Sequence, residues 1–145
     1  MKKHLIIGNP ISHTLSPKLH NYWFEKNKIN GKYDKVLLKE NEIESLIKKI
    51  KTKELHGMNV TVPYKQIVIS HLESLSETAK ITNSVNTIFN KDGKIHGDNT
   101  DVFGFQESLL NKNIDLKNKE VFIFGAGGVV PSIILALTNL NIKKI

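Results

Sequence analysis

The sequence predicts an α/β protein, with a mainly parallel sheet and flanking helices. In residues 1–62, short apolar runs that fit strands alternate with segments of helical period, which is the order typical of parallel sheets. Near the C-terminus, the apolar run Val121–Phe124 leads directly into the turn GAGG and a further apolar helical segment. This strand, glycine turn and helix resemble the first β-α unit of a Rossmann-like nucleotide domain.

The first three strands and two helices follow from local start and stop signals. An apolar strand at Leu5–Ile7 ends at Gly8-Asn9-Pro10. Ser16 is expected to cap the next helix, with Pro17 in its first position. A second strand is expected over 33–38, and a third from Met58 to Val62, where it stops at Pro63. Between them, a capping box of Asn41 and Glu44 starts a helix. This helix is expected to bury an apolar stripe of Ile43, Leu46, Ile47 and Ile50.

Asp92-Gly93 is the strongest short hairpin signal in the chain, and it joins expected strands over 85–90 and 94–96. Helices are expected over 74–81, 100–110 and 132–140. The polar, charged stretch 112–119 is the best domain boundary. We therefore expect residues 1–111 to form the domain that carries the reacting groups, and residues 112–145 to be the beginning of a dinucleotide-binding domain, truncated.

The composition excludes several kinds of partner. The net charge is +7, but all 21 basic residues are lysines. They are scattered without interleaved aromatics, so a solvated surface is favoured over a nucleic-acid site. No segment approaches the ~20 apolar residues that span a bilayer, so no membrane partner is expected. The lack of cysteine excludes disulfides and agrees with a location in the reducing cytoplasm. The six histidines lack the spacing of metal ligands, so no metal site is expected.

Lys65 is the candidate proton donor. It follows the third strand by two residues, at the carboxyl edge where α/β proteins place reacting groups, and a ketone reduced by hydride needs a proton on its oxygen. The ordinary alternative is a solvated surface lysine. Asp101 is the candidate carboxylate that would hold this ammonium, although an aspartate at a helix start usually caps the helix. Asn99 or Thr100 could provide that cap and leave Asp101 free.

The GAGG turn is the candidate nucleotide loop. Bare glycine backbone would let a pyrophosphate approach, and the helix N-terminus would face its charge. The same glycines could simply make a tight turn. Val130 also stands where the usual pattern has a third small residue, and Pro131 has no N–H to offer. The residue that distinguishes NAD from NADP lies about 20 positions further on, at or beyond Ile145, so the choice stays open.

Other polar residues have two interpretations each. The hydroxyl of Ser16 can cap a helix or bind a carboxylate, and both can hold together. Asparagine is uncommon in strands, so Asn59 and Asn86 indicate ligand contact or a bulge. The aromatic run Tyr22-Trp23-Phe24 is expected to lie in the core.

Taken together, these residues resemble the shikimate dehydrogenase family. The resemblance rests on five motifs in the family's order and spacing, and it covers essentially the whole chain, which corresponds to about the first half of such an enzyme. The motifs are GNPISHTLSP at 8–17, NVTVPYK at 59–65, VNTI at 85–88, GDNTD at 97–101 and GAGG at 125–128.

The resemblance implies a role for individual positions. Lys65 and Asp101 match the family's catalytic lysine and aspartate. The positions that match substrate-binding residues are Thr14, Ser16, Thr61 and Asn86, of which the first two hold the substrate carboxylate. The positions that match cofactor-binding residues are Glu77, Gly125, Ala126, Gly127, Gly128 and Val129. Thr14 stands where serine is commoner, and Val129-Val130-Pro131 replaces a small-small-arginine run that makes phosphate contacts.

The implied reaction is the NADP-dependent reduction of 3-dehydroshikimate to shikimate, a step of aromatic amino acid biosynthesis. Hydroxyls rather than arginine would hold the substrate carboxylate, which agrees with the arginine-free composition. Two alternatives stay open: an NAD-linked quinate/shikimate dehydrogenase, and a catalytically inactive substrate-binding fragment. The expected partner is a small-molecule substrate, with no nucleic acid and no membrane, and a homodimer is a further expectation.

Overall fold

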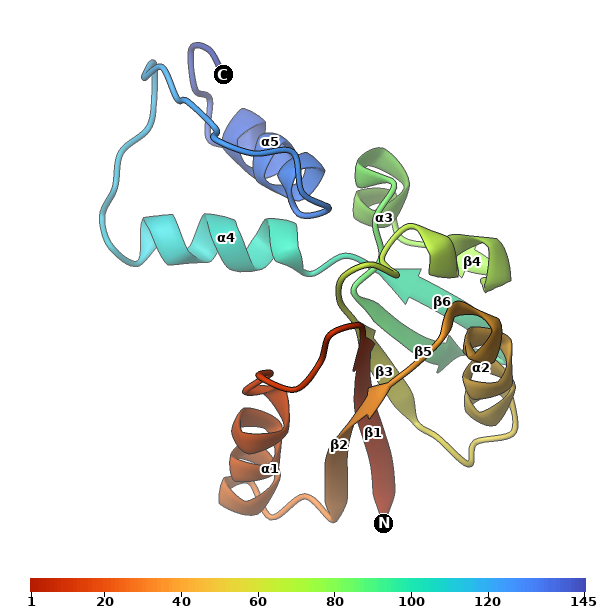
Figure 1. Cartoon of the computed structure of the whole chain (residues 1–145). Coiled ribbons are helices and arrows are strands. Elements are labelled where there is room, and N and C mark those ends of the chain that lie inside the picture. Colours follow the sequence, from red (N-terminus) through yellow and green to blue (C-terminus); the bar gives the residue numbers. More distant parts are fainter.

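A six-stranded sheet organises the chain, whose residues 1–145 are all described by a computed structural model (Figure 1). The strand order is β2-β1-β3-β5-β6-β4. The strands are β1 (Lys2–Gly8), β2 (Gly31–Leu37), β3 (Gly57–Val60), β4 (Ser74–Leu75), β5 (Thr87–Lys91) and β6 (Lys94–Asp98). The α-helices are α1 (Ser16–Lys26), α2 (Ile43–Lys51), α3 (Glu77–Thr82), α4 (Asp101–Leu110) and α5 (Val130–Asn139), and short 3-10 turns occupy Glu40–Glu42 and Ile67–His71.

The predicted fold class is confirmed. β1 pairs in parallel with both β2 and β3, and β4 pairs in parallel with β6. Only β5 is antiparallel to both of its neighbours, β3 and β6. The predicted hairpin connects it to β6. Asp92 and Gly93 have φ angles of 52° and 82° at that turn, as two-residue hairpins require.

The main core lies between the sheet and α2. Ile43, Ile47 and Ile50 are buried along one stripe of α2, as the sequence predicts. The stripe recurs at helical spacing, so the helix places all three side chains on the strands. The buried cluster comprises Leu5, Ile7, Leu38, Ile43, Ile47, Ile50, Leu55, Met58, Val60, Tyr64, Val68, Ala79, Val85, Ile88 and Ile95.

Ile50→Ala is expected to lower the free energy of unfolding by about 2–5 kcal/mol, because it leaves a cavity in a packed core. Ile81→Ala is the matched control, since it makes the same change in another helix. Ile50 is 0% exposed and Ile81 is 65% exposed. The control is expected to change the free energy by less than about 0.5 kcal/mol. Urea unfolding of both variants measures the difference, and equal losses would contradict this assignment of the core.

The other face of the sheet carries α1, and here the sequence-based expectation was wrong. Tyr22 and Trp23 are 55% and 44% exposed, and α1 has no fully buried residue. Of the aromatic run, Phe24 packs against Ile6 and Tyr33. Successive residues of a helix point about 100° apart, so three in a row cannot all face one sheet.

Two local expectations also differ from the structure. The capping bond before α2 runs from the Lys39 N–H to the Glu42 carboxylate, rather than between Asn41 and Glu44. Ser76 caps the helix expected over 74–81 by accepting the Ala79 N–H at 3.1 Å. That helix starts at Glu77, because the two residues before the cap form β4, which pairs with β6. This long-range pairing has no signal in the local sequence.

The C-terminal unit forms only in part. Residues 121–124 were expected to be a buried strand, but they are not a strand, and Phe122 and Phe124 are largely exposed. A strand needs a partner for its backbone groups, and only an isolated bridge from Glu120 to Lys144 lies next to this segment. The helix of the unit does form, as α5, and it lies beside α4, away from the strands of the sheet (Figure 1). None of the helices combines the length and the apolar character that a membrane span requires.

Candidate active site

The candidate site lies at the carboxyl ends of the parallel strands β1 and β3. β3 ends at Val60, two residues before the sequence predicted. The Thr61 N–H donates to the Ile7 carbonyl at 2.9 Å, and the Asn9 N–H donates to the Val62 carbonyl at 2.9 Å. These two bonds join the loop after β1 to the turn after β3. Open α/β sheets place ligands at this edge.

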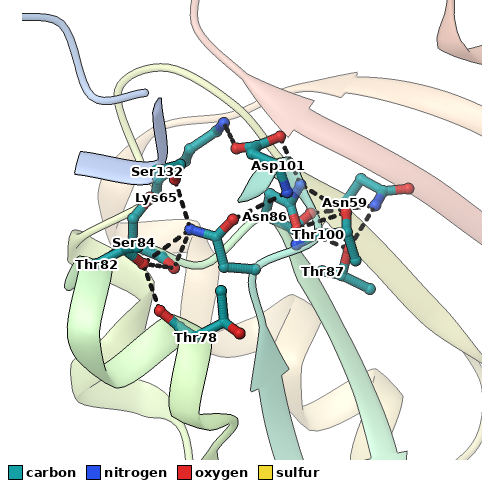
Figure 2. Close-up of polar contacts among 11 residues, drawn as sticks. Asn59, Lys65, Thr78, Thr82, Ser84, Asn86, Thr87, Thr100, Asp101 and Ser132 are labelled. Atoms are coloured by element: carbon teal, nitrogen blue, oxygen red, sulfur yellow. Dashed lines mark hydrogen bonds and ion pairs between the residues drawn. The ribbon is translucent and has the colours of Figure 1, made fainter. Parts of the chain in front are cut away.

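Lys65 sits in the turn after β3, with its backbone held on both sides. Its carbonyl accepts the Val85 N–H at 2.8 Å, and the preceding Tyr64 is buried and donates its hydroxyl to the Leu38 carbonyl at 2.5 Å. The Lys65 ammonium lies 2.5 Å from the Asp101 carboxylate, and the two side chains are 14% and 26% exposed. Figure 2 shows the two groups turned toward each other. The structure thus brings the two predicted catalytic residues together.

Asp101 is free for this contact because its carboxylate does not cap α4. The Asp101 N–H donates to the Asn99 side-chain oxygen at 3.0 Å. The carboxylate itself makes no capping bond: one oxygen accepts from Lys65, and the other accepts from the Asn86 amide at 2.8 Å. The interpretation of Asp101 as a helix cap was therefore wrong. Thr100 occupies the N-cap position without a side-chain bond, and the Asn99 side chain accepts the first N–H of the helix.

Hydrogen bonds from neighbouring residues hold Asn86 in one orientation. Its side-chain oxygen accepts the Thr100 N–H and the Thr87 hydroxyl, both at 3.0 Å. Asn59 donates its amide to the Asn86 carbonyl at 3.1 Å and accepts the Tyr33 hydroxyl at 2.6 Å. Burial raises the pKa of the Tyr33 phenol, which keeps it protonated as a donor. In this structure Asn59 therefore fixes the backbone of Asn86, and Figure 2 shows the two residues next to each other.

Thr14 and Ser16 lie in the loop after β1 and at the start of α1. Ser16 is already the first helical residue and does not cap the helix, contrary to expectation. The Thr14 hydroxyl donates to the Ser16 hydroxyl at 3.1 Å. The pair makes no hydrogen bond to Lys65 or Asp101, so it forms a separate hydroxyl cluster at a helix N-terminus.

A cleft of about 460 Å³ joins the turn after β3 to the glycine loop before α5. It contains one predicted catalytic residue, Lys65, one predicted substrate residue, Thr61, and three predicted cofactor residues. Its lining residues are Thr61, Val62, Pro63, Lys65, Gln66, Gly127, Gly128 and Val129. Lys65 and the glycine loop therefore share one hollow, whereas Asp101 contacts Lys65 from outside its lining.

The glycine loop has the properties of an anion cradle. The backbone N–H groups of residues 125–129 donate no hydrogen bond within the chain, and α5 begins immediately after them. Gly125 has a φ of +125°, which favours glycine, and a β-carbon added to Gly127 or Gly128 would meet only open space. Unbonded N–H groups at a helix start suit phosphate oxygens.

Glu77 is the predicted cofactor residue that the structure leaves apart from this cleft. It lies in the first turn of α3, where its exposed carboxylate pairs with Lys80 at 3.4 Å. Gly125 and Ala126 belong to the glycine loop but do not line the cleft. No group of three or more histidine, aspartate or glutamate side chains is placed to hold a metal ion.

Sequence reasoning missed a buried polar cluster next to the site. The side-chain nitrogen of Asn99 shares its two hydrogens among the Thr82 hydroxyl, the Ser84 carbonyl and the Ser132 hydroxyl, at 2.9, 3.0 and 2.8 Å. All four residues are buried. The local sequence indicates only a helix cap at Asn99 and a helix start at Ser132. Their contact joins positions 33 residues apart, so no local pattern could have revealed it.

Comparison with known proteins identifies the family. Residues 6–88 match the family model described as the shikimate dehydrogenase substrate binding domain. The chain belongs to the shikimate dehydrogenase family. The matched range covers the Thr14–Ser16 hydroxyls, Lys65 and Asn86, and it ends before Asp101 and the glycine loop.

Curated and structural relatives agree with this assignment. The NADP(+) shikimate dehydrogenase of Pelagibacter ubique (strain HTCC1062) is 56% identical over 99% of this chain and 54% of its own length. The shikimate dehydrogenase structure from Aquifex aeolicus has a TM-score of 0.92 and 33% identity, over 99% of this chain and 54% of that chain.

A third relative was solved with a ligand. The shikimate 5-dehydrogenase of Thermus thermophilus, in complex with shikimate, has a TM-score of 0.91 and 29% identity, over 99% of this chain and 55% of that chain. The chain spans about half the length of the relatives that it matches.

Proposed function

We propose that the protein containing this chain reduces 3-dehydroshikimate to shikimate with NADPH, in aromatic amino acid biosynthesis. The observation that carries the proposal is the Lys65–Asp101 contact of 2.5 Å beside a cleft that also reaches the glycine loop. It places a proton donor and a possible nucleotide site in one hollow. The family assignment and the names of the relatives indicate the substrate and the cofactor.

In this proposal Lys65 is the general acid. When bound, NADPH supplies a hydride to the C3 carbonyl carbon of the substrate. The Lys65 ammonium gives its proton to the carbonyl oxygen, so the ketone becomes a secondary alcohol, and the amine then regains a proton from solvent. Asp101 holds the ammonium at the cleft, and its second oxygen is fixed by Asn86. An orienting carboxylate of this kind reduces the number of positions that the proton donor can adopt.

The substrate carboxylate is assigned to the hydroxyls of Thr14 and Ser16. They are adjacent, they stand at the N-terminal end of α1, and a helix N-terminus favours negative charge. The chain has no arginine that could bind the carboxylate instead. Thr61 and Asn86 are assigned to the ring hydroxyls, because Thr61 lines the cleft and Asn86 contacts Asp101.

The residues present fit a dinucleotide phosphate. Gly125, Ala126, Gly127, Gly128 and Val129 would hold it through their unbonded N–H groups, next to the start of α5. Glu77 is assigned to the cofactor site on the family resemblance alone, because its exposed side chain lies outside the cleft. We propose that residues 1–111 form the substrate-binding and catalytic domain and that residues 112–145 belong to a Rossmann-like nucleotide domain.

The proposal also includes a cytoplasmic location, which the lack of cysteine supports and which cell fractionation tests. It includes a homodimer as well, which light scattering tests.

Steady-state assays of the complete gene product test the function. Shikimate and quinate are each oxidised with NADP+ and with NAD+, and the absorbance of the reduced nicotinamide is followed. We expect the kcat/KM for shikimate with NADP+ to exceed that of every other pair at least about tenfold, which is ~1.4 kcal/mol of transition-state discrimination. A preference for quinate or NAD+ would favour the quinate/shikimate alternative. Absence of turnover with all four pairs would favour a substrate-binding protein without activity.

A further inference from the structure

We propose that Asn99 is a positioning residue that ties α5, and with it the glycine loop, to the start of the helix that carries Asp101. The inference rests on the proposed function for its catalytic consequence, but the physical link is visible without it. The Asn99 side chain bonds Asp101 through its oxygen and Ser132 through its nitrogen. One buried amide therefore contacts the backbone of Asp101 and the helix that follows the glycine loop.

The surroundings permit only one orientation of this amide. On one side lies the Asp101 N–H, a donor, which needs the Asn99 oxygen. On the other side lie the Thr82 hydroxyl, the Ser84 carbonyl and the Ser132 hydroxyl, which accept from the Asn99 nitrogen. A rotated amide would place donor against donor and leave buried groups unsatisfied, which is costly. The amide cannot turn without disturbing α5 or the start of α4.

The Asn99–Ser132 hydrogen bond is also the only side-chain hydrogen bond between the two proposed domains. Among the side-chain hydrogen bonds, only Asn99–Ser132 connects residues 1–111 with residues 112–145, and no ion pair does. Ser132 is the third residue of α5 and lies three positions after Val129, which lines the cleft. The position of the glycine loop relative to Lys65 and Asp101 therefore depends on this bond and on the packing of α5 against α4 and α3.

The catalytic consequence follows from the geometry of hydride transfer. The hydride donor would be held by the glycine loop, whereas the proton donor is held by Asp101. A reaction that needs both loses rate when their spacing varies by about an ångström. Asn99 contacts neither the cleft nor Lys65, so its role is to fix the distance between groups that do.

Ser132→Ala tests the link, because it removes one acceptor of Asn99 and keeps the bond to Asp101. Asn99→Ala is less suitable, since it also removes the cap of α4 and could prevent folding. Thr82→Val is the matched control: it too removes one buried hydroxyl that accepts from Asn99, but on the α3 side. Both variants leave Asn99 with two acceptors.

The first measurement needs no ligand. The chain has no cysteine, so cysteines introduced at the exposed positions Lys49 and Asn139 can carry spin labels on α2 and α5. Pulsed electron paramagnetic resonance on the complete gene product then gives the distance distribution. We expect a single narrow distribution in the parent and in Thr82→Val, and a distribution at least about twice as wide in Ser132→Ala. An unchanged width in Ser132→Ala overturns the link, whatever the activity.

The second measurement is kinetic. Ser132→Ala is expected to lower kcat about fivefold while the KM for shikimate changes less than twofold, and Thr82→Val is expected to keep kcat within twofold of the parent. A broadened distance distribution with unchanged kcat overturns the positioning role. If the parent shows the expected distances but does not act on shikimate, the link stands and the proposed function has failed.

Discussion

Lys65→Ala in the complete gene product is expected to lower kcat for shikimate oxidation by about 10²–10⁴-fold, the usual contribution of a positioned general acid or base. The substituted side chain cannot exchange a proton with the substrate oxygen. No other ammonium replaces it, because no other lysine lines the cleft. The KM for shikimate is expected to change less than about threefold, since the carboxylate and ring contacts are assigned to other residues. Initial rates across substrate concentration separate the two effects.

A surface pair in the same chain provides the control. Lys32 and Asp34 form an ion pair at 3.0 Å with side chains that are 58% and 57% exposed. Lys32→Ala makes the same chemical change as Lys65→Ala but lies outside the cleft, so it is expected to keep the parent rate. If Lys65→Ala retains more than about a tenth of the rate, less than ~1.4 kcal/mol of the barrier is lost, and Lys65 is not the proton donor.

Asp101→Asn is expected to lower kcat/KM by about 10²-fold, which corresponds to ~2.7 kcal/mol. The change keeps the size of the side chain but removes the negative charge opposite Lys65. It also turns one oxygen into a donor that faces either the Lys65 ammonium or the Asn86 amide, both of which are donors themselves. The ammonium then loses the partner that aims it at the cleft. Steady-state rates, together with a thermal unfolding scan, measure the effect on function and on folding.

Asp34→Asn is the matched control for this second change. An exposed pair of this kind contributes at most about 1 kcal/mol to stability, and it lies away from the cleft, so the rate is expected to stay unchanged. A rate for Asp101→Asn within threefold of the parent, with a normal unfolding temperature, would show that Asp101 has no part in placing the proton donor.

Part of the fold could be predicted because its signals are local. The apolar stripe of α2 and the Asp92-Gly93 hairpin both appear where the sequence placed them. Each depends on residues within a few positions of one another: helical spacing in the first case and positive φ angles in the second. The position of Lys65 just after β3 is of the same kind, although the strand ends at Val60 and not at Pro63.

The errors have the opposite origin. Tyr22 and Trp23 are apolar enough for a core, but their exposure depends on what the rest of the molecule brings to α1. Phe122 and Phe124 have the composition of a buried strand, but without neighbouring strands they remain exposed and irregular. Burial is a property of the assembled layers, and hydrophobicity alone indicates only that a residue could be buried.

The sequence by itself determined the α/β class, the order of the motifs and the residue types of the candidate site, because short-range spacing and the shikimate dehydrogenase motifs carry that information. Only the tertiary structure decided that Asn99 relieves Asp101 of capping, that Lys65 and Asp101 meet across 36 positions of sequence, and that Ser132 ties α5 to the same place. The physical reason is that a buried hydrogen bond selects its partner by proximity in space. Folding brings together donors and acceptors that no local pattern pairs in advance.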